Sequence, residues 1–181
     1  MNKKYELGII VGRFQVLHLG HIDMIDQALT LCNEVGILIG SSQESGTLKN
    51  PLTYEKRCEV IHSIYGDSVK TFPLPDIGVG NVSAWGDYVL ENVKIFFGRL
   101  PDVLVSGEED RRTSWLNDDS GIDEVFVPKT IDISATQMIQ YLIEDDRASW
   151  KKYIDPRFYP MYEELRQIVI MSKDNLDTKS L

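Results

Sequence analysis

The residues best suited to chemistry in this chain lie in the segment Gly12-Arg13-Phe14-Gln15-Val16-Leu17-His18-Leu19-Gly20-His21. An apolar run over residues 7–11 precedes it and an amphipathic segment over residues 22–29 follows it, which predicts a strand, a tight loop and a helix. The free amides at the start of a helix attract anions, and histidines at positions i and i+3 lie on one side of it. Backbone donors, two imidazoles and the Arg13 guanidinium therefore gather in one loop. This combination predicts a binding site for a chain of phosphates.

The alternative interpretation is that His18 and His21 are ordinary polar residues at a helix N-terminus. Their placement around Gly20, directly after a buried strand and with Arg13 alongside, favours the phosphate site. The pattern G-x-x-x-x-G-K-[ST] is absent, which excludes a P-loop. The pattern G-x-G-x-x-G is absent from the first turn, which disfavours a dinucleotide cofactor site.

A second group of polar residues, Ser134 and Thr136, follows the last predicted strand and starts a helix. Two hydroxyls on a first helical turn can bind phosphate oxygens together with the free amides. Taken alone, Ser134 is more simply an N-cap residue. In a doubly wound sheet, however, this turn and the histidine loop both open at the carboxyl edge of the strands, so both can serve one site.

The elements that position these residues follow from alternating apolar runs and amphipathic segments. Strands are expected over residues 7–11, 34–40, 69–74, 102–107 and 124–127, and helices over residues 22–29 and 83–97 and from Thr53, Ser134 and Pro156 onward. This alternation predicts an α/β protein with a doubly wound, mainly parallel sheet covered on both faces. We expect a single domain over residues 1–171 and a frayed polar tail over residues 172–181.

Composition narrows the class of protein. The chain has 181 residues and a formal net charge of −9, which argues against nucleic acid as a partner because phosphate backbones need a basic surface. Cys32 and Cys58 are too few for a disulfide framework or a zinc site. No apolar run of about 18 residues and no signal peptide are found, so we expect no membrane association and a cytoplasmic location.

Two signatures connect the chain to a known family. Gly12-Arg13-Phe14-Gln15 with His18-Leu19-Gly20-His21 resembles the H-x-G-H signature of the nucleotidylyltransferase superfamily, and Ile133-Ser134-Ala135-Thr136 resembles its second signature, I-S-x-T-x-x-R. Within the superfamily, the chain is most similar to the archaeal-type nicotinamide mononucleotide (NMN) adenylyltransferases and to related domains fused to Nudix hydrolases. Residues 39–53 are similar to the G-S-A-Q…NPFT segment of that group. Leu74 to Ile77, followed by Asn81 and Trp85, resembles its P-x-x-D-I…N…W stretch. Asp145-Asp146 and Trp150 match its late D-x-x-W feature. No Nudix box is present, so a bifunctional enzyme is not expected.

The resemblance implies a Rossmann-like nucleotidylyltransferase fold and transfer of AMP from ATP to NMN, which gives NAD and pyrophosphate by direct in-line attack. It implies that His21 contacts the α-phosphate, that His18 orients the triphosphate, and that Arg13 and Lys49 neutralise phosphate charge. It also implies that ATP carries Mg²⁺, so we expect no metal cage made of protein ligands. The remaining residues implied for ATP are Gly12, Phe14, Gln15, Gly20, Gly107, Ser134 and Thr136, and those implied for NMN are Trp85, Asn81, Asp76 and Ser41.

Several of these residues have a plainer interpretation. Trp85 lies on an apolar helical face and is equally suited to the core, whereas the resemblance implies that it stacks on the nicotinamide ring. Asp76 and Asn81 lie near glycines and suit turns. Gly107 precedes an acidic segment that suits a solvated turn, although the fold often contacts adenosine at this place.

One departure from the family pattern leaves the function open. The arginine that ends the second signature, and that helps bind the ATP phosphates in the family, is replaced by Ile139. The alternatives are a nucleotidylyltransferase that acts on another phosphorylated small molecule, and an ATP-binding pseudoenzyme weakened by this replacement. Relatives that resemble this chain are commonly homo-oligomers, so a homo-oligomer is a further expectation.

Overall fold

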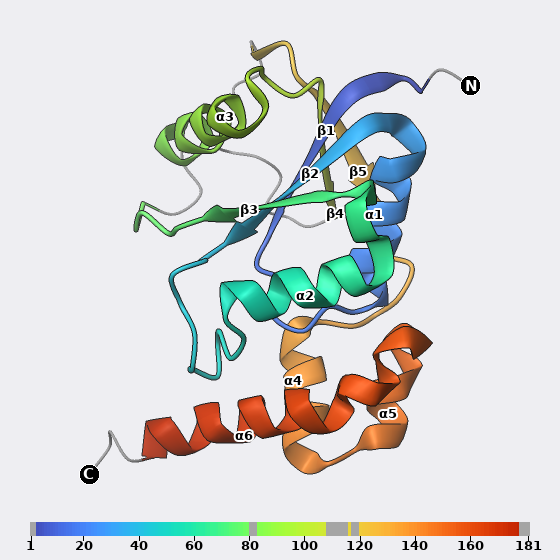
Figure 1. Cartoon of the computed structure of the whole chain (residues 1–181), viewed down its shortest axis with the longest axis vertical. Coiled ribbons are helices and arrows are strands. Elements are labelled where there is room, and N and C mark those ends of the chain that lie inside the picture. Colours follow the sequence, from blue (N-terminus) through green and yellow to red (C-terminus); the bar gives the residue numbers. More distant parts are fainter. Residues whose placement is uncertain (1–2, 80–82, 108–115, 117–119, 178–181) are drawn as a thin grey trace.

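The computed structural model describes residues 3–79, 83–107, 116 and 120–177 (Figure 1). The strands in this part of the chain form one five-stranded sheet in the order β3-β2-β1-β4-β5, and every neighbouring pair is parallel. The predicted α/β class and parallel sheet are confirmed. The strands are β1 (Tyr5–Gly12), β2 (Cys32–Gly40), β3 (Lys70–Leu74), β4 (Val103–Gly107) and β5 (Asp123–Val127).

Helices connect β1 to β2, β2 to β3 and β3 to β4, and further helices follow β5. They are α1 (Leu19–Leu31), α2 (Tyr54–Tyr65), α3 (Ser83–Phe97), α4 (Ala135–Glu144), α5 (Arg147–Lys152) and α6 (Tyr162–Asp177), with short 3₁₀ turns at Gly66–Ser68 and Pro156–Met161. None of the helices in the described residues is long and apolar enough to cross a membrane.

The order of the strands reverses beside β1. The chain builds outward from β1 through β2 to β3 and then returns to place β4 on the other side of β1. In open α/β sheets, ligands bind at the carboxyl ends of the strands where the order reverses. The segment that starts at Gly12 leaves β1 at this position, so the fold places the histidine loop at the expected binding edge.

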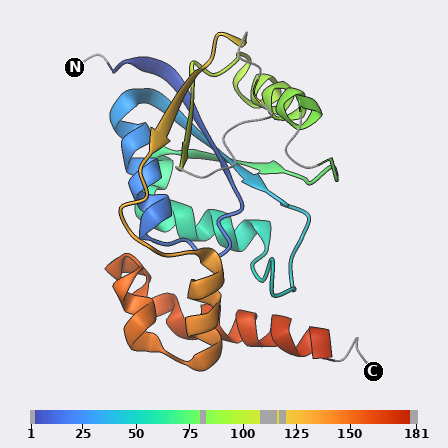
Figure 2. The ribbon, with the colours of Figure 1, turned by 180° about the vertical axis from the view of Figure 1, so that it is seen from behind.

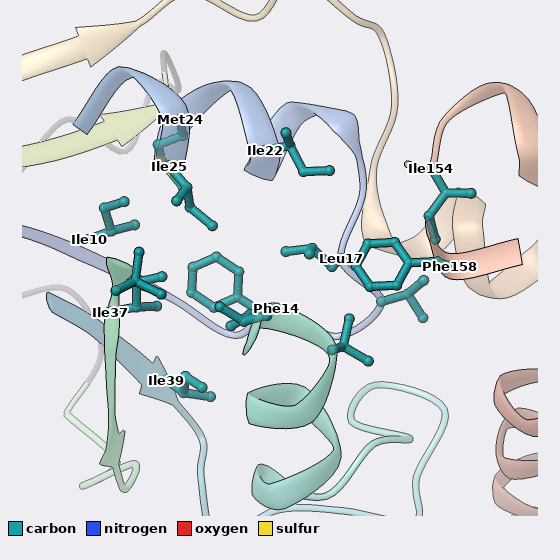
Figure 3. Close-up of a cluster of buried hydrophobic side chains, with 14 of the residues drawn as sticks. Ile10, Phe14, Leu17, Ile22, Met24, Ile25, Ile37, Ile39, Ile154 and Phe158 are labelled. Atoms are coloured by element: carbon teal, nitrogen blue, oxygen red, sulfur yellow. The ribbon is translucent and has the colours of Figure 1, made fainter. Parts of the chain in front are cut away.

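Side chains alternate between the two faces of the sheet, as the pleat of a strand requires. Ile10 and Ile37 belong to the larger buried cluster, on the face covered by α1 and α2, and Figure 3 shows both beside Phe14 and Ile25. Their sequence neighbours Ile9 and Leu38 belong to a smaller cluster that includes Val89 and Val93 of α3. Burial on both faces explains why these strands read as continuous apolar runs.

The C-terminal helices α4, α5 and α6 form a compact group past α2, which both overall views show (Figures 1 and 2). Trp150 and the stripe Phe158, Tyr162, Leu165 and Val169 are buried in the larger cluster. In Figure 3, Leu17 of the histidine loop lies beside Ile154 and Phe158 of this group. The Leu19 amide also donates to the Tyr153 carbonyl at 2.9 Å. The C-terminal helices therefore support the histidine loop directly.

Two sequence expectations about this region need correction. The short helix α5 was not expected, and Asp146 begins it by accepting a hydrogen bond from the Ser149 amide. The segment from Ser172 was expected to fray, but α6 continues to Asp177. Ser172 is buried and its hydroxyl donates to the Ile168 carbonyl at 2.8 Å, which explains why the helix continues through this polar residue.

Candidate active site

The loop between β1 and α1 is held by its own apolar side chains. Phe14, Val16 and Leu17 are at most 2 % exposed. Phe14 and Val16 adopt positive φ angles of 50° and 68°, which is an unfavourable backbone region for a β-branched valine. Burial of these side chains offsets the backbone strain, of order 1–3 kcal/mol per residue. The loop therefore has one defined shape before any ligand binds.

His18 and His21 lie together at the start of α1, as the sequence predicted. Their ring centroids are 3.8 Å apart, and the Phe14 ring lies 5.0 Å from that of His21. The His18 amide donates to Nδ1 of His21 at 3.4 Å. A side chain on Gly20 would place its Cβ 3.2 Å from Cε1 and Nδ1 of His18, so glycine leaves room for this ring.

The environment keeps both imidazoles neutral near pH 7. Burial, followed by the positive charge of Lys129, lowers the pKa of His18 to about 4. Burial, followed by the neighbouring His18, lowers the pKa of His21 well below its usual value. His18 is 8 % exposed, and its Nδ1 is buried without a hydrogen-bond partner in the described part of the chain. At the start of α1 the Leu19 amide donates to the Tyr153 carbonyl, and the His21 and Ile22 amides donate to the His18 carbonyl.

Arg57 of α2 was not identified from the sequence. Its side chain is 1 % exposed, and its guanidinium donates to the carbonyls of Gly40, Arg13 and Ser41 at 2.8, 2.9 and 3.1 Å. Its Nε also donates to the Thr53 carbonyl at 3.2 Å. Arg57 thus ties together the chain segments that leave β1 and β2. The signal available in the sequence was an arginine beside the apolar stripe of α2.

A second buried clamp joins the histidine loop to the segment over residues 41–53. The Gln15 side chain accepts from the Leu52 amide at 2.9 Å and donates to the Leu52 carbonyl at 3.2 Å. Arg13 Nη1 donates to Oδ1 of Asn50 at 3.4 Å, and the exposed Lys49 directly precedes Asn50 in the sequence. The structure therefore brings Arg13 and Lys49 into adjacent loops. Both polar atoms of the Gln15 side chain are used in this clamp.

Ser41 and Asp76, which follow β2 and β3, contact one another. Ser41 has a φ of 46°, and its Oγ donates to Oδ2 of Asp76 at 3.1 Å. Gln43 closes this group by accepting from the Asp76 amide at 2.9 Å and donating to the Asp76 carbonyl at 3.3 Å. Asn81, also expected near the acceptor, lies outside the described residues.

Three further candidate residues are Trp85 on α3, Gly107 at the end of β4 and Thr136 on α4. Trp85 is half-buried against the α3 cluster, with its ring centroid 5.5 Å from that of Tyr88. Gly107 is exposed at the carboxyl end of β4, where it pairs with Val127 of β5. Thr136 is exposed in the first turn of α4. The packing of Trp85 against the α3 cluster is compatible with a role in the core.

The start of α4 shows the N-cap that the sequence allowed. The Ser134 hydroxyl accepts from the Gln137 amide at 3.3 Å and donates to Oε1 of Gln137 at 2.8 Å. Ile139, at the position of the signature arginine, is 8 % exposed and belongs to the larger buried cluster. The second signature therefore keeps its helix start, while its last position has become part of the core.

The described residues contain no group of three or more His, Cys, Asp or Glu side chains suited to holding a metal ion. The site brings together the start of α1, two neutral imidazoles and the cations of Arg13 and Lys49 at the reversal point of a parallel sheet. A five-stranded parallel sheet whose order reverses at a strand–loop–helix turn is the architecture of the Rossmann-like class of α/β proteins.

Residues 9–149 match the model of the cytidylyltransferase-like family, and the chain belongs to this family of nucleotidylyltransferases. It is 30% identical over 182 residues to the nicotinamide-nucleotide adenylyltransferase of Thermococcus kodakarensis, covering 94% of this chain and 90% of that protein. It is 38% identical over 106 residues to the protein of the same name from Saccharolobus solfataricus, covering 54% of this chain and 60% of the relative.

A solved structure supports the same fold. The bifunctional NMN adenylyltransferase/ADP ribose pyrophosphatase of Francisella tularensis superposes with a TM-score of 0.77 at 24% identity, covering 97% of this chain. The chain spans about half the length of that protein, 55%. These comparisons confirm the predicted superfamily and the Rossmann-like nucleotidylyltransferase fold.

Proposed function

We propose that this protein transfers AMP from ATP to NMN and thereby forms NAD and pyrophosphate. The observation that carries the proposal is the His18–His21 pair, packed at 3.8 Å on the first turn of α1 at the reversal point of the sheet. Support comes from the nicotinamide-nucleotide adenylyltransferase of Thermococcus kodakarensis, which is 30% identical over 94% of this chain.

The reaction needs no nucleophile from the protein. A phosphate oxygen of NMN attacks the α-phosphorus of ATP, and the bond from that phosphorus to the oxygen bridging to the β-phosphate breaks. That oxygen leaves with pyrophosphate and keeps the bonding electron pair. Catalysis then consists of alignment of the two reactants and stabilisation of the charge that builds on the phosphate oxygens.

The two histidines are suited to this stabilisation. A neutral imidazole donates one N–H, and we assign such a contact to His21 at the α-phosphate and to His18 toward the β-phosphate. The approach of a polyanion favours the protonated form, so binding of ATP raises both pKa values from their lowered state. The rings thus gain positive charge when the phosphates need it.

Cations from two loops complete the phosphate site in this proposal. Arg13 and Lys49 neutralise the phosphate charge, and the clamp between Gln15 and Leu52 sets the spacing of their loops. The backbone of the loop, including Gly12, Phe14 and Gly20, supplies shape and amide donors. Magnesium enters as part of the ATP substrate, because a small hard cation prefers phosphate oxygens and water.

At the α4 side, Thr136 and the Ser134 hydroxyl contact the β- and γ-phosphate oxygens in this proposal. Ser134 then exchanges its bond to Oε1 of Gln137 for a phosphate oxygen. Its bond from the Gln137 amide continues to cap the helix.

For the acceptor, we assign the nicotinamide ring to Trp85, because a pyridinium over an indole gains ~1–2 kcal/mol when desolvated. Ser41 and Asp76 already form one hydrogen-bonded pair, which offers a carboxylate oxygen to the ribose or carboxamide. Gly107 at the end of β4 remains our candidate for the adenosine contact.

The test is pyrophosphate release by the purified protein with Mg²⁺ and ATP, and with NMN, nicotinic acid mononucleotide or no acceptor, followed by mass analysis of the product. His21→Ala is the diagnostic variant, and His62→Ala on the exposed face of α2 is the matched control. NAD formation that is lost only in His21→Ala supports the proposal. Product formation only with another acceptor points to a different nucleotidylyltransferase.

A second candidate function, an ATP-binding pseudoenzyme, is favoured by one observation, the burial of Ile139 at the arginine position. It predicts that folded protein binds ATP and releases no pyrophosphate with any acceptor. That result would overturn the proposed transfer reaction and leave the phosphate site in place.

A further inference from the structure

Helix α4 itself contributes no cation to the proposed phosphate site. Helix α4 contains no lysine or arginine, and Ile139 lies in the core. Two arginines that follow α4 are already engaged. Arg147 pairs with Glu163 and lies 4.3 Å from the Tyr162 ring centroid, and Arg166 pairs with Asp145 at 3.2 Å. These contacts join α6 to the segment that ends α4, so both guanidiniums serve packing of the C-terminal helices.

Lys129 differs from these two arginines in its position and in the strength of its ion pair. It follows β5 by two residues, on the connection from β5 to α4 that passes the first turns of α1 in both overall views (Figures 1 and 2). The connection is pinned there because the Thr130 hydroxyl donates to Oδ2 of Asp23 at 2.8 Å. Lys129 thus lies past the carboxyl end of β5, on a connection that is held against α1, the helix that begins at His18.

The only ion pair found for Lys129 in the described part of the chain is weak. Its Nζ lies 3.0 Å from Oδ1 of Asp132, whose side chain is 97% exposed, while that of Lys129 is 48% exposed. Exposed pairs of this kind contribute little, because water screens them and two long side chains must be held in place. A polyphosphate carries several negative charges and displaces a single solvated carboxylate readily.

His18 also senses the charge of Lys129. The positive charge of Lys129 adds to burial in lowering the pKa of His18. His18 is buried, and its Nδ1 has no hydrogen-bond partner among the described residues. The Lys129 ammonium therefore lies close enough to act on His18 electrostatically, and the Thr130–Asp23 bond holds their two segments together.

We propose that Lys129 binds the β- and γ-phosphates of ATP from the β5–α4 connection, as the cation that α4 itself does not provide. In the absence of ATP, Asp132 holds the ammonium near this position. This inference rests on the proposed use of ATP, but the binding of inorganic tripolyphosphate tests it without the transfer reaction.

The experiment measures binding of ATP, AMP and inorganic tripolyphosphate by calorimetry to Lys129→Ala, with Lys152→Ala on α5 as the control. Loss of one charge-assisted contact is expected to raise the Kd of ATP and of tripolyphosphate by about tenfold. The Kd of AMP, which lacks both phosphates, is expected to stay within about twofold. Asp132→Asn frees the ammonium and is expected to lower the Kd of ATP by roughly two- to threefold.

The outcomes separate this inference from the proposed function. Unchanged ATP and tripolyphosphate binding in Lys129→Ala overturns the role of Lys129, even if the wild-type protein forms NAD. An equal loss of AMP affinity also overturns it, because the contact would then not be to the outer phosphates. Selective loss of tripolyphosphate binding supports it, even if the wild-type protein forms no NAD.

Discussion

Replacement of Arg57 by methionine is expected to destabilise the protein and to weaken its phosphate site. The guanidinium lies 2.8 Å from the Gly40 carbonyl and 3.1 Å from the Ser41 carbonyl, and both bonds are buried. It also holds the Arg13 carbonyl at 2.9 Å. Methionine fills similar space but donates no hydrogen bond, so the buried carbonyls lose this donor.

The magnitude follows from the two buried bonds. Each buried carbonyl left without a partner costs ~1–3 kcal/mol, and a charged donor lies toward the upper end of that range. Desolvation of the guanidinium no longer opposes folding in the variant, which returns part of this cost. We therefore expect the free energy of unfolding to fall by about 3 kcal/mol. For a chain of this size that change lowers the melting temperature by roughly 6–12 °C.

The assay is urea unfolding of the wild type, Arg57→Met, Arg57→Lys and Arg99→Met. Lysine keeps the charge with fewer donors, so an intermediate loss is expected. Arg99 pairs with the half-exposed Asp102, and its replacement is expected to cost less than about 1 kcal/mol. A loss in Arg57→Met no larger than that in Arg99→Met would refute the role given to the buried bonds. At temperatures where all variants are folded, Arg57→Met should also raise the KM for ATP.

Three other predictions concern the site. The His18 pKa of about 4 means that the folded state binds fewer protons than the unfolded state below pH 6.5, so stability is complete above that pH and is lost as the pH falls. Unfolding at pH 7 and about pH 4.5 should differ by about 2 kcal/mol for this group, and the His18→Gln variant should lose that part of the difference. Gly20→Ala should keep or slightly raise the melting temperature, because alanine favours a helix. The same change should lower kcat/KM by roughly tenfold or more, because the added Cβ displaces the His18 ring. Unchanged activity would contradict the role given to the 3.2 Å contact. Trp85→Leu should raise the KM for NMN by about fivefold and leave the KM for ATP unchanged, whereas an equal rise in both would indicate a core role.

Much of the fold could be predicted because strands and helices leave local patterns in the chain. The apolar runs placed five strands to within a few residues, and the expected helix over residues 83–97 has the same bounds in the structure. Thr53 and Ser134 cap α2 and α4 as predicted, since a cap bonds to an amide only three residues away. The expectation of a frayed tail was wrong for residues 172–177, because α6 continues through them and buries Ser172, and burial depends on the tertiary packing of the chain.

The histidine loop could be recognised from the amino-acid sequence because its chemistry lies within one short segment whose strand, glycine and helix start are all local. The roles of Arg57 and Lys129 could not, because each arises from contacts between segments far apart in the chain. Burial of Arg57 requires β1 and β2 to lie side by side. The place of Lys129 requires the β5–α4 connection to dock on α1. The lowered pKa values of the histidines have the same origin, because desolvation exists only once the chain has packed around the rings.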